Sequence, residues 1–110
     1  MTLKESLDKA TKIADRLNQG FADGAGHDVI HDPLHEIGHV LADVPMMVKD
    51  STSLSDENKT SLAAAVEDLM DGYGKIDEKF HGGEGAEFAD VKDKIEAALA
   101  TVKSVMGTMN

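Results

Sequence analysis

The sequence predicts an all-α protein, an antiparallel up-down-up-down four-helix bundle that forms a single domain over residues 1–110. Four segments carry apolar residues at alternating spacings of four and three, the period of a helix that buries one face. Aromatic residues make up only 4% of the chain, so the core must be aliphatic, which suits packed helices. No segment alternates polar and apolar residues as a half-buried strand would.

The first helix is expected to run from Leu3 to about Gly20. Thr2 and Glu5 have the T-x-x-E spacing of a capping box, in which two side chains satisfy free N–H groups at a helix start. Gly20 is the expected stop, because glycine commonly follows the last turn of a helix. The apolar stripe of this helix comprises Leu3, Leu7, Ala10, Ala14 and Leu17.

The second helix contains two prolines. Pro33 is expected in its first turn, where a missing N–H costs little. Either Asp32 caps a helix that starts at Pro33, or the helix starts a turn earlier near Ile30, and the unbroken stripe favours the earlier start. Pro45 would meet the carbonyl of Leu41, so we expect a kink or an early end there. The stripe comprises Ile30, Leu34, Ile37, Leu41, Val44 and Val48.

The third and fourth helices complete the predicted bundle. Ser55 is the expected N-cap of the third helix, and Asp56 and Glu57 suit the positive end of its dipole. Four such helices with short connections bury their stripes most simply in an antiparallel up-down order. The third stripe comprises Leu62, Val66, Leu69, Tyr73, Ile76 and Phe80, and the fourth comprises Phe88, Val91, Ile95, Ala98, Val102, Val105 and Met109.

Composition excludes several classes of function. The net charge is −10 without any basic run, so neither nucleic acid nor an anionic membrane is an expected partner. The absence of cysteine excludes disulfides, thiolate metal sites and cysteine nucleophiles. No apolar run approaches the roughly 20 residues of a membrane span, and the first residues enter an amphipathic pattern directly. We therefore expect a cytoplasmic protein that associates with itself, as a homo-oligomer, or with other proteins.

Four of the five histidines are spaced four residues apart, which places each one turn beyond the last on a helix. In an up-down bundle the start of the second helix, the end of the third and the start of the fourth meet at one pole. We therefore expect a cluster of imidazole and carboxylate groups there, a combination that suits Zn²⁺ or, with more carboxylates, Fe or Mn. The predicted ligands are His27, His31, His35, His81, Asp77, Glu84 and Glu87.

The leading functional prediction is a non-enzymatic metal-binding, zinc-like or metal-responsive interaction protein. The main alternative is a structural or partner-binding bundle without metal. In that case His81 and Gly82 simply end a helix, and the acidic residues are caps and solvated surface.

The stretch from His35 to His39 reads H-E-I-G-H and resembles the helix of zinc metallopeptidases. The resemblance implies that His35 and His39 bind zinc and that Glu36 acts as general base. It covers about seven residues, and Ala42 stands where the longer peptidase motif has glycine. A small zinc hydrolase is thus the third functional prediction. His35 and His39 can also hold half of a zinc site that bridges two copies of the chain. An ideal helix wheel turns both away from the core.

Overall fold

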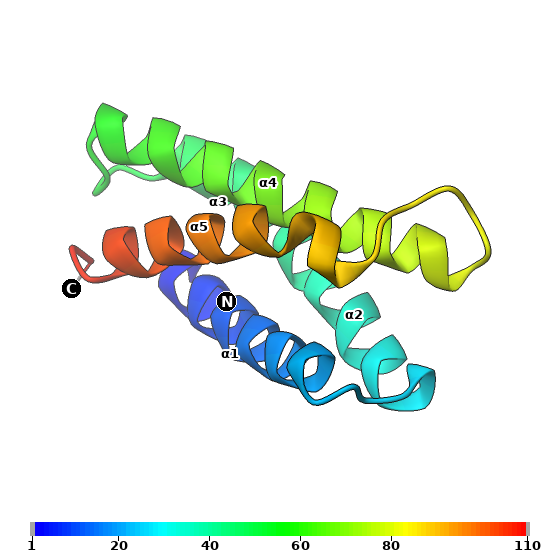
Figure 1. Ribbon diagram of the computed structural model, residues 1–110. Helices are drawn as coiled ribbons and strands as arrows, with labels where there is room; N and C mark the ends of the chain where they lie inside the picture. The colour runs from blue at the N-terminus through cyan, green and yellow to red at the C-terminus, as the bar shows by residue number, and fades with distance from the viewer. Residues whose placement is uncertain (1, 110) are drawn as a thin grey trace.

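The computed structural model describes residues 2–109, with the exception of the side chain of His27 (Figure 1). Within these residues the chain forms helices and no strand, so the prediction of an all-helical bundle is confirmed. A pair of helices, α2 and α3, replaces the second predicted helix. The helices are α1 (Leu3–Ala22), α2 (His27–Ala42), α3 (Val44–Asp50), α4 (Asp56–Phe80) and α5 (Phe88–Met106).

The helices pack as a closed ring around one core. Helix α1 contacts α2, α3 and α5, and α4 contacts the same three helices from the other side. Figure 1 shows α4 and α5 side by side, with α1 and α2 beneath them. The Lys4 ammonium donates to the Met109 carbonyl at 3.3 Å, and the rings of Phe21 and Phe88 stack at 4.5 Å. These two contacts fit opposite directions for α1 and α5, while the complete up-down order stays a prediction.

The core is aliphatic, as the composition predicts. Nearly all residues of the four stripes are buried, and the ends of the stripes, such as Leu3, Phe80 and Phe88, are partly buried. The capping box of Thr2 and Glu5 is present, and the Ser55 hydroxyl accepts from the Asn58 N–H at 3.1 Å. Among the described residues, no helix combines the length and the apolar character needed to cross a bilayer.

The predicted stop of α1 at Gly20 is wrong. The helix continues to Ala22, and Gly24 closes it with a φ of 70°. The Gly24 N–H donates to the Phe21 carbonyl and the Ala25 N–H to the Gly20 carbonyl, which is the Schellman pattern. Gly20 instead allows α1 and α2 to pack closely, because a Cβ there would lie 2.7 Å from the Ile30 Cδ1 of α2.

The prolines divide the second predicted helix. Helix α2 begins at His27, so the earlier start is confirmed and Pro33 lies inside the helix, beyond the first turn where it was expected. The expected early end is also confirmed, because α2 ends at Ala42 and Pro45 occupies the first turn of α3. The break at Asp43 removes the clash between the proline ring and the helix before it. The stripe continues across the break through the buried Val44 and Val48.

The end of α4 is closed by glycines. Gly82 has a φ of 82° and donates its N–H to the Lys79 carbonyl, while the Gly83 N–H donates to the Glu78 carbonyl at 2.9 Å. This is again a Schellman motif, and it makes His81 the C-cap of α4. The loop then folds back along α4, where the Ala86 N–H donates to the Lys75 carbonyl at 3.0 Å.

Two glycines of α4 provide a matched test of the packing. A Cβ on Gly72 would lie 2.8 Å from the Ile95 Cγ1, whereas a Cβ on Gly74 would meet nothing within 4 Å. Alanine gains about 1 kcal/mol of helix propensity at either site. Overpacking costs about 1–3 kcal/mol at Gly72 alone. We therefore expect Gly72→Ala to be about 1–3 kcal/mol less stable than Gly74→Ala in urea unfolding, and equal stability would contradict the close approach of α4 and α5.

The buried hydroxyl of Tyr73 makes the stability of the folded protein fall at alkaline pH. This hydroxyl donates to the Asn18 Oδ1 at 2.8 Å, joining α4 to α1 across the core. Burial raises the pKa of Tyr73 far above its usual range, although the Asn18 hydrogen bond opposes this rise. The folded state holds the phenol proton more tightly than the unfolded chain, so the stabilisation is complete below about pH 10 and is lost as the pH rises further.

We expect the free energy of unfolding to fall more steeply above about pH 10 in the wild type than in Tyr73→Phe, by up to about 1.4 kcal/mol per pH unit. Urea unfolding of both proteins at several alkaline pH values measures this difference. Tyr73 is the only tyrosine in the sequence, so phenolate absorbance reports its ionisation directly. Parallel pH profiles for the two proteins would contradict the expectation.

Candidate metal centre

Three histidines from two helices come together at one end of the bundle. His31 and His35 lie one turn apart on α2, and His81 caps the end of α4. One ring nitrogen of each lies within 4.8 Å of the other two. The ring centroids are 4.5 Å apart for His31 and His35, and each is 6.0 Å from that of His81. The three side chains are therefore close enough to hold a single metal ion.

The cluster is accessible from solvent. The exposed fractions of the side chains are 35% for His31, 47% for His35 and 56% for His81. A metal ion can reach such a site without opening the fold. The rings also keep enough freedom to rotate by the small amount that coordination requires.

Asp77 lies beside two of the three histidines. Its Oδ1 is 3.6 Å from the Nε2 of His35 and 3.3 Å from the Nε2 of His81, which follows it by one turn on α4. The Oδ1 atom is buried, and it accepts no hydrogen bond from the described residues. A buried carboxylate oxygen without a hydrogen bond is costly and requires an explanation.

The separations between these atoms fit shared coordination better than hydrogen bonding. Metal–ligand bonds of about 2.0–2.1 Å place the ligand atoms of a tetrahedral zinc site about 3.3–3.4 Å apart. The distances from Asp77 Oδ1 to the two imidazoles are 3.3 and 3.6 Å. A cation between these atoms would satisfy the oxygen that hydrogen bonding leaves unpaired.

The structure brings only some of the predicted ligands together. His31, His35 and His81 form the cluster, and Asp77 lies beside His35 and His81, while Glu84 lies in the turn after α4. Glu87 is the N-cap of α5, where its N–H donates to the Asp90 Oδ2 at 3.3 Å. In the described part of the chain, the group of close ligand atoms contains only the three histidines, so it includes neither glutamate and does not include Asp77. The side chain of His27 lies outside the described residues. For Glu84, Glu87 and His27 a ligand role stays a prediction.

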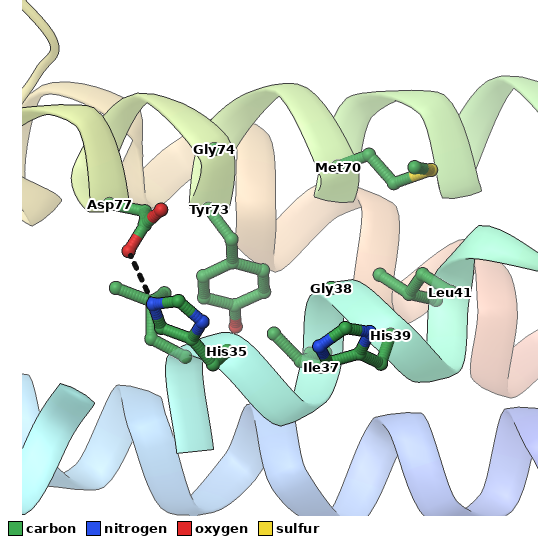
Figure 2. Close-up of a pocket in the computed structure, with 10 residues that line it drawn as sticks. His35, Ile37, Gly38, His39, Leu41, Met70, Tyr73, Gly74 and Asp77 are labelled. Carbon is green, nitrogen blue, oxygen red and sulfur yellow. Dashed lines mark ion pairs between the residues drawn. The ribbon is translucent and has the colours of Figure 1, made fainter. Parts of the chain in front are cut away.

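Sequence reasoning missed a groove beside the cluster. The helix wheel turned His35 and His39 away from the core, whereas both line a groove of about 320 Å³ between α2 and α4 (Figure 2). The physical reason is that α2 packs against both α1 and α4, so residues near the edge of its stripe still face a neighbouring helix. Gly38 and Gly74, two glycines at exposed helical positions, were the signal in the sequence.

The H-E-I-G-H stretch does not form a centre of its own among the described residues. The close group includes His35 but neither Glu36 nor His39. His35 instead faces Asp77 of α4, as Figure 2 shows. The geometry therefore favours the cluster over the peptidase arrangement that the motif resembles.

Three imidazoles and a carboxylate supply four nitrogen and oxygen donors, which is a ligand set for Zn²⁺ and related transition metals. No family model, curated protein or solved structure matches this chain. Its function is therefore inferred from the chemistry and geometry of its own residues.

Proposed function

We propose that this protein binds one zinc ion per chain through His31, His35 and His81, with Asp77 as the fourth ligand. The observation that carries the proposal is the convergence of three ring nitrogens within 4.8 Å of one another. The Oδ1 of Asp77, which accepts no hydrogen bond from the described residues and lies beside His35 and His81, supports the fourth position. The protein is then a metal-responsive bundle.

Zinc fits this ligand set for two reasons. Zinc sites commonly combine imidazole and carboxylate ligands in a tetrahedron, and the Asp77 distances match its edges. Zinc imposes no geometric preference from d electrons, so half-exposed side chains on two helices can adapt around it. Copper(II) binds most nitrogen ligands more tightly but favours a square-planar arrangement.

Metal binding would join two separate parts of the fold. Two of the ligands lie on α2, while the other two lie at the end of α4. An ion that binds only the folded chain stabilises it by about 2.7 kcal/mol when its free concentration is 100 times the Kd. The site thus gives the bundle a stability that depends on zinc.

We expect His31→Ala and His81→Ala each to weaken zinc binding at least tenfold, or by about 1.4 kcal/mol. Calorimetric titration of untagged protein with Zn²⁺ measures the affinity. His39→Ala is the matched control, because it removes a histidine one turn beyond His35 that is not among the close ligand atoms. Equal loss in His39→Ala and His31→Ala would contradict the assignment.

Asp77→Asn tests the proposed fourth ligand independently of the three histidines. The amide keeps the shape of the carboxylate but removes its charge, so we expect zinc affinity to fall by about 10- to 100-fold while the fold is retained. The same titration measures this change, and circular dichroism checks the helix content. Unchanged affinity would remove Asp77 from the site and leave three histidine ligands.

The stoichiometry of the purified protein tests the proposal against its alternatives. We expect elemental analysis to find close to one zinc ion per chain in untagged protein prepared without chelator. Half an ion per chain would favour a bridge between two copies through His35 and His39. No bound metal, together with no tight binding on titration, would leave a metal-free partner-binding bundle.

A further inference from the structure

We propose that the groove between α2 and α4 binds a small monocarboxylate with an apolar tail, whose carboxylate coordinates the zinc ion. This inference rests on the proposed function, because the ion supplies the attraction for the carboxylate. It adds a ligand and its chemical class to a centre otherwise formed by protein side chains alone.

The groove is continuous with the metal centre. His35 belongs to both, and Asp77 lies beside it. Figure 2 shows these two residues at one end of the groove, with Leu41 and Met70 towards the other. Its volume of about 320 Å³ lies at the lower end of the range for small-molecule sites, which is about 300–1,000 Å³. The groove therefore suits a ligand of a few carbon atoms and is too small for a folded partner.

Two glycines keep the groove open. Gly38 lies on the α2 wall and Gly74 on the α4 wall, and a Cβ on either would meet nothing within 4 Å. Glycine costs about 1 kcal/mol relative to alanine in a helix, and no close packing requires it at these two positions. The open space is the feature that both glycines share.

Away from His35 and Asp77, the residues that line the groove are apolar with the exception of His39. Buried aliphatic side chains and the ring of Tyr73 form its floor, and Met70, with a 40% exposed side chain, borders it. A flexible thioether adapts to ligands of different shapes. The buried aliphatic residues that line the groove are Leu34, Ile37 and Leu41.

The net charge of the zinc-loaded site determines that the head group of the ligand is an anion. A zinc ion with three neutral imidazoles and one carboxylate keeps a net charge of +1. Zinc also expands from four to five ligands, which leaves a position for an anion from solvent or the groove. Without the ion, Asp77 repels an anion from the same end. A carboxylate at the ion and an apolar tail along the floor therefore match the groove from end to end.

Titration of the zinc-loaded, untagged protein with acetate and with hexanoate tests the proposal. Burying a methylene group adds up to about fourfold in affinity, so we expect hexanoate to bind at least about tenfold more tightly than acetate. We expect neither acid to bind measurably to the metal-free protein. Equal affinities for the two acids would mean coordination without use of the groove and would overturn the proposal.

Leucine substitutions that fill the groove provide a second test of the proposal. We expect Gly74→Leu, and independently Gly38→Leu on the opposite wall, to weaken hexanoate binding at least about tenfold relative to the wild type while zinc affinity stays the same. Both positions are exposed and helical, so the fold should tolerate leucine there. Ala64→Leu is the matched control, because it adds the same side chain to an exposed position of α4 outside the groove.

The outcomes distinguish this proposal from the one on which it rests. Zinc binding without hexanoate binding, or Gly74→Leu and Gly38→Leu proteins that bind hexanoate like the wild type, would overturn the groove proposal and leave the zinc site in place. Failure to bind zinc would overturn both. The expected result is that Gly74→Leu and Gly38→Leu lose hexanoate binding and that Ala64→Leu keeps it.

Discussion

The candidate centre depends on the way in which α4 ends. Gly82 takes a left-handed conformation that costs other residues about 1–2 kcal/mol, and two backbone hydrogen bonds close the helix around it. The loop then returns along α4, where a Cβ on Gly85 would overlap the Lys75 carbonyl. Glycine is thus required for the backbone to pass so close to the helix. These contacts fix His81 one turn beyond Asp77 and beside α2.

The cluster contributes little to folding. Its ion pairs involve side chains between about a third and a half exposed, and such pairs stabilise proteins by about 0–1 kcal/mol. Buried aliphatic residues on all the helices supply the main driving force instead. The core therefore carries the stability, and the histidines at the pole add little to it.

The sequence was sufficient for the parts of the fold that local patterns determine. The spacing of apolar residues identified the core, and the Thr2 and Ser55 caps follow from local hydrogen bonding. Gly20 was misread because a glycine near a helix end can serve either the backbone or the packing, and only the position of Ile30 decides between them. Helix α2 starts before Pro33, and Ile30 in this early part of the helix is buried against Gly20 of α1.

The sequence also predicted part of the candidate site. The spacing of His31 and His35, and the expected meeting of helix ends, pointed to His81 and Asp77. The direction of His35 was missed because a helix wheel assumes one buried face, whereas α2 has two neighbours in the ring. The groove was missed because Gly38 and Gly74 lie on different helices, and only the packing of α2 against α4 brings the two glycines to one space.

The electrostatics of α4 connect the metal to the groove. Asp77 and Glu78 lie in the last turn of this helix, where the negative end of the dipole disfavours carboxylates, and Lys79 is the only Lys or Arg in that turn. The whole chain carries a charge of −10, so this pole repels anions and attracts cations. A divalent ion beside Asp77 would relieve that repulsion and reverse the local sign of the potential. Under the proposed function, an anionic ligand would enter the groove only after the ion had bound, so occupation of the groove would depend on metal by electrostatics alone.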